Sequence, residues 1–178
     1  MIIFRQPEYN EQLEIRKLLF RLPEYLFFTK ESVITMEKVH ITLPETWLFE
    51  TLLPVRIGDI NYGNHLANDA VLRLAHEVRL QFLTAHHYSE MNIENTGLIM
   101  ANAVIQFINQ AFYGDELLCK IGFGHIGKTN FDLITQMIRP KDNKEIARIK
   151  TGMACFDYTQ QKIKAIPQAF LQLAMSSE

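Results

Sequence analysis

The part of the chain that follows Gly97 is a series of short stretches in which apolar and polar residues alternate, and this feature constrains the fold most. Alternation with a period of two is typical of strands with one buried face. It predicts strands at about residues 99–107, 117–123, 131–137 and 146–158. Turn residues separate them at 113–115, 127–128 and 139–143. Because turns this short cannot form a parallel crossover, the strands are expected to be antiparallel neighbours.

The clearest helical pattern precedes these strands, at about residues 66–86. Its apolar face consists of Ala67, Val71, Leu74, Ala75, Val78 and Phe82. Asn64 or Asn68 is expected to cap its first turn. Residues 47–57 form another extended, apolar stretch, where Pro54 indicates an edge strand or a bulge. We therefore predict an α+β fold, with a five-stranded antiparallel sheet wrapped around one long central helix.

The first 35 residues differ from this pattern. Leu13, Leu18 and Leu22 follow helical spacing and Pro23 would end the helix, so residues 1–35 are predicted to be an appended amphipathic helix. Met36 offers an alternative, in which residues 1–35 result from an upstream start. In either case residues 36–178 are long enough for a single domain, and a short helix is expected after Pro167.

Composition excludes several classes of protein. The formal net charge of -2 gives no basic excess for nucleic-acid binding, and no apolar run approaches the length of a membrane span. Cys119 and Cys155 are too few for a disulfide framework or a thiolate metal site, and both fall on the apolar face of strands. We expect a cytoplasmic protein without a metal.

Residues 56–69 hold the densest group of polar side chains, between the first strand and the long helix. Free amide groups and the helix dipole favour negative charge at such a position. They can stabilise a carbonyl oxygen that becomes an oxyanion. A carboxylate just upstream, here Asp59, can attack that carbonyl or activate a water molecule against it. A turn-forming role for Asp59 is the alternative.

Asp59, Gly63, His65 and Asn68 resemble the Asp-x-Asp-x-x-Gly-His-x-x-Asn signature of hotdog-fold acyl-CoA thioesterases, the 4-hydroxybenzoyl-CoA thioesterase-like group. The resemblance extends over about residues 40–160. Two positions depart from the signature: Asn61 replaces its second acid, and Asn64 precedes His65 where the signature has glycine. These departures leave a mechanism with one carboxylate.

The resemblance implies hydrolysis of an acyl thioester without a cofactor. Asp59 would be the nucleophile or general base, and His65 would orient it or the thioester. The amides from Asn64 to Leu66 would polarise the carbonyl, and Asn61, Tyr62 and Gly63 would complete the substrate site. The family's sites lie at subunit interfaces, so a homodimer or homotetramer is expected. The substrate that the resemblance implies is an acyl-CoA or an acyl carrier protein thioester. Lys128, Arg139 and Lys141 are expected to be either phosphate contacts or solvated loop charges.

Other interpretations remain open. Glu77 is a rival for the catalytic carboxylate, because other hotdog thioesterases place theirs on the helix. Gly58, Asp59 and Asn61 with His65 also approach the Gly-Asp-x-Asn-Pro-x-His motif of hotdog enoyl-CoA hydratases, with one extra residue and no proline. A non-catalytic module that binds acyl thioesters is the third possibility.

Two further stretches resemble known binding motifs, but the residues around them do not fit those motifs. His76-Glu77 lacks the second histidine of a zinc-protease helix, since position 80 is leucine. The glycines at 122, 124 and 127 match a dinucleotide-binding motif but precede a strand instead of a helix, so bulges and a turn are expected there.

Overall fold

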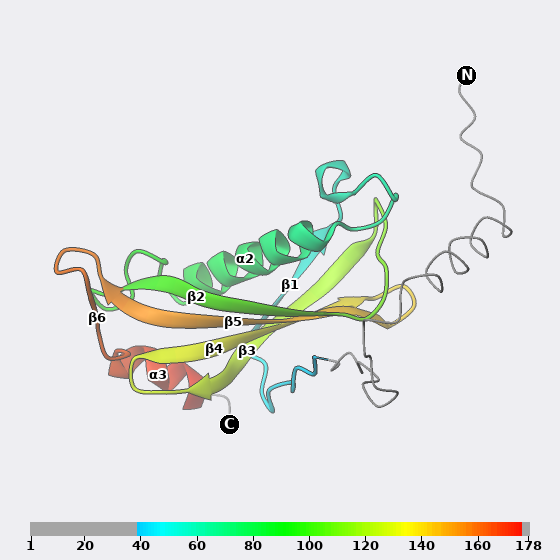
Figure 1. The fold of residues 1–178 in the computed structure, drawn as a ribbon. Helices are drawn as coiled ribbons and strands as arrows, with labels where there is room; N and C mark the ends of the chain where they lie inside the picture. Colours follow the sequence, from blue (N-terminus) through cyan, green and yellow to red (C-terminus); the bar gives the residue numbers. More distant parts are fainter. Residues whose placement is uncertain (1–38, 176–178) are drawn as a thin grey trace, which may run out of the picture. The chain divides into compact units, whose positions relative to one another are not determined.

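An antiparallel sheet curves around helix α2 (Asn68–Ala85) in the computed structural model, which describes residues 39–175 (Figure 1). The strands, in chain order, are β1 (Phe49–Pro54), β2 (Gly97–Phe107), β3 (Glu116–Ile126), β4 (Asn130–Arg139), β5 (Lys144–Asp157) and β6 (Lys162–Ile163). Their order in the sheet is β1-β3-β4-β5-β2, and β6 pairs with β5. The expected α+β fold with five antiparallel strands around a helix is confirmed. The two-residue strand β6 is an addition.

Helix α2 forms where the apolar spacing predicts it, and every residue of the predicted apolar face is buried. The helix is shorter than expected by two residues at its start and one at its end. The N-cap residue is Ala67, which makes no side-chain cap hydrogen bond, so Asn64 does not cap the helix, but Asn68 does accept a free N–H of the first turn. Asn68 lies inside the helix, where its Oδ1 accepts the N–H of Asp69 at 3.1 Å.

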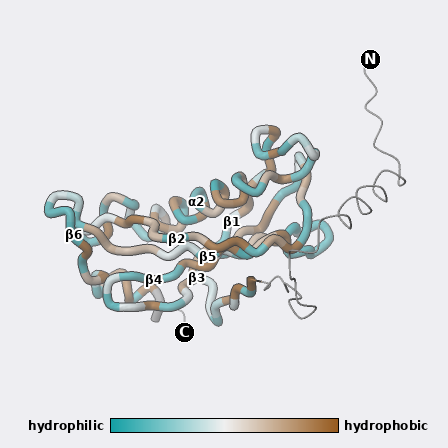
Figure 2. The backbone as a smooth tube through the Cα atoms, viewed as in Figure 1, coloured by the Kyte–Doolittle hydropathy of each residue, from teal (hydrophilic) through white to brown (hydrophobic). Residues whose placement is uncertain are grey.

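The inner face of the sheet supplies the other half of the core. Alternate residues of β3, namely Leu117, Cys119, Ile121 and Phe123, are buried. The ring centroids of Phe123 and Phe82 lie 6.5 Å apart, so this set of residues faces α2. Hydrophobic residues gather on the strands and along α2, whereas the connecting loops are largely hydrophilic (Figure 2).

Both cysteines belong to this core, as expected. Cys119 and Cys155 are fully buried and free. Burial raises the pKa of the Cys119 thiol to about 12, which keeps it protonated and unreactive at neutral pH.

Part of the opposite face of the sheet, at β3, is contacted by the segment at residues 39–48, which the sequence patterns do not predict (Figure 1). A side chain at Gly122 would place its Cβ 2.6 Å from the carbonyl oxygen of Thr46 and 2.9 Å from Pro44. Gly122 therefore permits close contact between this segment and β3. As expected, Gly124 lies at a register shift between Phe123 and Ile126 and Gly127 lies at the following turn, whereas Gly122 pairs regularly with Ile134.

Helix α3 (Gln168–Met175) closes one end of the core, immediately after Pro167 as predicted. Phe170 is fully buried, and its ring lies 5.5 Å from Phe123, 5.4 Å from Phe131 and 5.6 Å from Tyr88. The short helix thus joins the β3–β4 hairpin to the chain that follows α2.

Residues 1–38 lie outside the described part of the chain, so the predicted N-terminal extension at residues 1–35 and its boundary stay predictions. Within residues 39–175, no helix combines the length and the apolar character that crossing a membrane requires.

Candidate functional site

The polar segment predicted as the site folds into a closed turn between β1 and α2. It begins with the short 3-10 helix η1 (Ile57–Asp59). The N–H of Asn61 then donates to the carbonyl of His65 at 3.0 Å, and the N–H of Ala67 donates to the carbonyl of Asp59 at 2.8 Å. These two bonds bring both ends of the segment together, so Asp59 lies beside the first residues of α2.

Asp59 sits at the end of η1 with its side chain only 14% exposed. Its Oδ2 accepts the N–H of Arg56 at 2.9 Å, and its Oδ1 lies 3.6 Å from Nη2 of Arg73. One oxygen therefore caps η1, whereas the other faces the half-exposed guanidinium of Arg73.

Asn61 and His65 contact each other across the turn. Nδ2 of Asn61 lies 3.4 Å from Nδ1 of His65, which is also 3.3 Å from the carbonyl oxygen of Leu66. Oδ1 of Asn61 accepts the N–H of Gly63 at 2.8 Å. Asn61 thus shapes the turn and holds the imidazole ring, which is what an amide can do in place of the signature's second carboxylate.

The three amides proposed to polarise a carbonyl are not equivalent. Asn64, whose φ of 63° is left-handed, donates its N–H to Asn61 at 3.0 Å. Leu66 donates its N–H to the carbonyl of Ala111 at 2.8 Å. Both groups already have protein acceptors. Of the three, the amide of His65 is the one without an acceptor among residues 39–175.

A cavity of about 430 Å³ opens beside the start of α2. Asn61, His65, Leu66 and Asn68 form one wall of it, and Val71 of α2 extends that wall. The opposite wall comes from the end of β2, the following loop and the start of β5, through Phe107, Ile108, Asn109, Gln110, Ala111, Ile146 and Ala147. The lining is apolar apart from neutral amides and the imidazole, so it suits an uncharged group.

Sequence patterns do not identify the loop at residues 108–111 as part of the site. Ile108 and Asn109 each donate their N–H to the carbonyl of Ile146, at 2.9 and 3.1 Å, and Nδ2 of Asn109 donates to Glu145 at 2.8 Å. The loop is held by contacts between residues far apart in the sequence. No local signal in Asn109 or Gln110 could have placed them beside His65.

Several predicted site residues lie elsewhere. Tyr62 is fully exposed, and Gly63 and Asn64 form the exposed tip of the turn. Asp59 lies in the polar segment, at the end of η1, but it does not line the cavity of the single chain. Glu77, the rival carboxylate, is exposed on α2, where its Oε1 accepts Nε2 of Gln81 at 2.8 Å.

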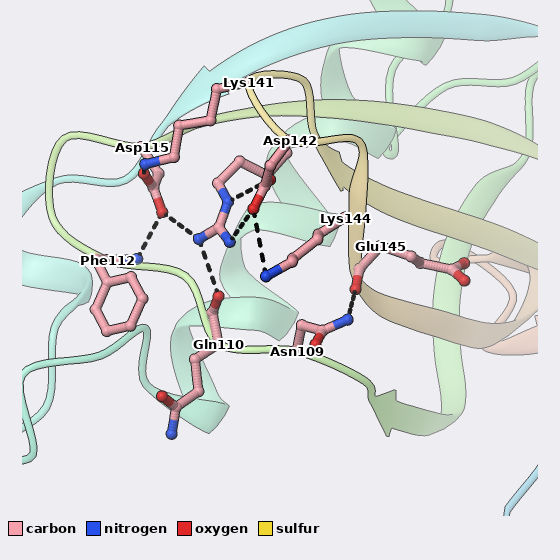
Figure 3. Close-up of polar contacts among 9 residues, drawn as sticks. Asn109, Gln110, Phe112, Asp115, Lys141, Asp142, Lys144 and Glu145 are labelled. Atoms are coloured by element: carbon pink, nitrogen blue, oxygen red, sulfur yellow. Dashed lines mark hydrogen bonds and ion pairs between the residues drawn. The ribbon is translucent and has the colours of Figure 1, made fainter.

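Arg139 is not a solvated loop charge, whereas the Lys141 side chain is 64% exposed in the β4–β5 turn. The Arg139 side chain is only 7% exposed and pairs with Asp115 and Asp142, and Lys141 also binds Asp115 (Figure 3). The phosphate contact and the solvated charge expected for Arg139 are therefore both wrong, because its guanidinium makes four hydrogen bonds to protein acceptors. Lys128 is exposed.

Metal binding finds no support in the described residues. No group of three or more histidine, cysteine, aspartate or glutamate side chains in residues 39–175 is arranged to hold a metal ion.

Comparison with known proteins identifies the fold and the family. The model of the thioesterase-like superfamily matches residues 55–173. Comparison with curated proteins gives no match. Among solved structures, a 1,4-dihydroxy-2-naphthoyl-CoA thioesterase from Synechocystis superposes with a TM-score of 0.66 at 21% identity, covering 72% of this chain and 96% of its own.

Two other solved structures show the same fold. A thioesterase-superfamily protein from Jannaschia sp. CCS1 has a TM-score of 0.67 at 18% identity, covering 75% of this chain and 85% of its own. A gentisyl-coenzyme A thioesterase has a TM-score of 0.61 at 15% identity, covering 70% of this chain and 98% of its own. The expected hotdog fold is confirmed.

Proposed function

Because the chain belongs to the thioesterase-like superfamily, we propose that it is an acyl-CoA thioesterase in which Asp59 is the catalytic carboxylate. The observation that carries this proposal is the closed turn before α2. It holds a nearly buried carboxylate and a cavity-lining imidazole within one short segment, at the positive end of a helix.

In the proposed reaction, water and the acyl thioester give a carboxylic acid and a free thiol. Asp59 either attacks the thioester carbonyl, forming an anhydride that water then cleaves, or removes a proton from the attacking water. The amide of His65 donates a hydrogen bond to the carbonyl oxygen as negative charge develops on it. The sulfur leaves with the bonding electron pair and is protonated from solvent.

The cavity supports an apolar or aromatic acyl group. Its aliphatic and aromatic lining can enclose a hydrocarbon surface, and the amides of Asn61, Asn68 and Asn109 can bind hydroxyl substituents. The names of two structural neighbours specify hydroxylated aromatic acyl-CoA substrates, which fits this combination. We propose coenzyme A as the thiol and the cytoplasm, where the free cysteines stay reduced, as the location.

The test is an acyl-CoA panel that includes aliphatic, aromatic, hydroxyaromatic and enoyl thioesters, with thiol release and enoyl absorbance recorded together. A thioesterase releases thiol from at least one member, and we expect the aromatic thioesters to be preferred. Loss of enoyl absorbance without thiol would instead identify a hydratase. Stabilisation by an acyl-CoA without turnover would identify a binding module.

We also propose that the active unit is a homodimer joined through β2. β2 is an edge strand that pairs only with β5 among the described strands. Its alternating apolar residues are not buried in the single chain: Ala101 and Ala103 are exposed, and Phe107 is 58% exposed. An exposed apolar edge strand favours pairing with another strand.

Replacing Ala103 with glutamate should therefore disrupt the dimer, because a charge on an edge strand opposes pairing and two copies would place like charges near each other. Light scattering of the native protein should give a multiple of the 20.7 kDa chain mass, and the variant should give the monomer mass. A matched change on the other edge strand, Thr51→Glu, should leave the assembly intact. A monomeric native protein that is fully active would contradict the proposal.

A further inference from the structure

The buried Arg139 is connected to the candidate site through the loop that forms one wall of the cavity. Its Nη1 donates to the carbonyl of Gln110 at 3.1 Å and to Oδ2 of Asp115 at 2.9 Å. Nε and Nη2 donate to the two oxygens of Asp142, each at 2.8 Å (Figure 3). The guanidinium thus joins the end of β4, the β4–β5 turn and the loop that precedes β3.

Asp115 extends this connection to the same loop. Its Oδ2 accepts the N–H of Phe112 at 2.9 Å, and its side chain is 4% exposed. Burial alone would raise the pKa of the Asp115 carboxyl, but hydrogen bonds from Lys141 and Arg139 outweigh burial and hold that pKa below its usual range. Asp115 is therefore ionised at neutral pH, and the buried ion pair stays intact.

Ala111 lies between Gln110, which Arg139 binds, and Phe112, which Asp115 binds. Its own backbone carbonyl bonds the turn before α2 instead. Ala111 is fully buried, and its carbonyl accepts the N–H of Leu66 at 2.8 Å. The peptide groups on both sides of Ala111 are thus fixed by Arg139, directly or through Asp115, whereas Ala111 itself fixes the residue after His65. A shift of this loop would move the amide and the ring of His65.

We propose that Arg139 is a positioning residue for the candidate site, which it reaches through Gln110, Ala111 and Leu66. The inference rests on the proposed function for its catalytic consequence, but the coupling from Arg139 to Leu66 is measurable without catalysis. A structural arginine that only stabilised the β4–β5 hairpin would affect the stability of the fold but not the geometry at His65.

The test uses Arg139→Lys, because lysine keeps the buried positive charge but cannot reach Asp142, Asp115 and Gln110 together as a planar guanidinium does. Arg148→Lys is the matched control. Like Arg139, Arg148 donates two hydrogen bonds to one carboxylate, that of Glu145, at 2.7 and 2.9 Å. It also donates one hydrogen bond to a backbone carbonyl, that of Ile41, at 2.9 Å. Arg148 bonds the side chain of Glu145 and does not contact the Glu145 backbone carbonyl that accepts Nδ2 of Asn109, so this variant leaves the printed bonds of residues 108–112 in place.

Two measurements decide the proposal. Amide hydrogen exchange at Leu66, followed by NMR, should become at least tenfold faster in Arg139→Lys and should change less than twofold in Arg148→Lys. With an acyl-CoA that the native protein hydrolyses, Arg139→Lys should lower kcat at least tenfold and change KM less than twofold, because the His65 amide acts mainly in the transition state. Arg148→Lys should leave both constants unchanged.

Unchanged exchange at Leu66 in a folded Arg139→Lys protein would overturn the proposal, whatever the protein's activity. Faster exchange together with native kcat would also overturn it, because the loop would then move without consequence for the site. If the native protein hydrolysed no acyl-CoA, the proposed function would fail, and exchange at Leu66 would still decide whether Arg139 fixes this segment.

Discussion

Replacing Asp59 with asparagine is expected to lower thiol release from the preferred acyl-CoA at least a hundredfold, equivalent to about 2.7 kcal/mol in the activation free energy. Asparagine keeps the size of the side chain and one oxygen acceptor. That oxygen can still accept the N–H of Arg56, which lies 2.9 Å from Oδ2 in the native protein. It removes the negative charge that attacks the carbonyl or takes the proton from water. The rate constant for hydrolysis, measured under saturating substrate, checks this prediction.

Asp69→Asn provides the control for the Asp59 variant. Asp69 is exposed on the first turn of α2, and it pairs with Arg73, the same arginine that approaches Asp59. The two substitutions therefore remove the same charge beside the same cation. Asp69→Asn should retain native turnover, and thermal unfolding should show both variants folded. Equal losses in the two variants would mean that net charge at the helix start matters instead, and full activity of Asp59→Asn would make Glu77 the next candidate.

The fold is predictable from the sequence where local patterns carry the information. The apolar face of α2, the strands after Gly97 and the turn at Gly114 follow from periodicity and from residues that tolerate unusual backbone angles. Gly114 indeed has a φ of 82°. Each of these features depends on neighbours within a few residues, so a single sequence is enough to find it.

The contacts that complete the site depend instead on strand register. Arg139 and Gln110 are 29 residues apart in the chain, and neither carries a local signal that the other lies beside it. Arg79 shows the same limit. It is 5% exposed within the apolar face of α2, where its Nε donates to Oε1 of Glu90 at 2.7 Å. A buried arginine needs such a partner, but the sequence does not say which acid supplies it.

The location of Asp59 was predictable for a different reason. A carboxylate just before an amphipathic helix has a physical role whatever the rest of the fold, because the helix start attracts negative charge. The sequence could not distinguish the amides, however. Asn64 donates to Asn61 and Leu66 donates to Ala111, whereas the His65 amide has no acceptor in the described part of the chain, and one of these acceptors comes from a distant loop.

Replacing Phe170 with alanine is expected to cost about 3–5 kcal/mol of unfolding free energy, the usual range for a buried phenylalanine. Phe170 is fully buried and makes ring contacts with Tyr88, Phe123 and Phe131. Removing it leaves a cavity between α3 and the sheet that rigid strands cannot fill. Urea unfolding measures the loss, and Gln172→Ala, an exposed position on the same helix, should change stability by less than about 0.5 kcal/mol. A loss below about 1 kcal/mol for Phe170→Ala would show that α3 is dispensable to the core.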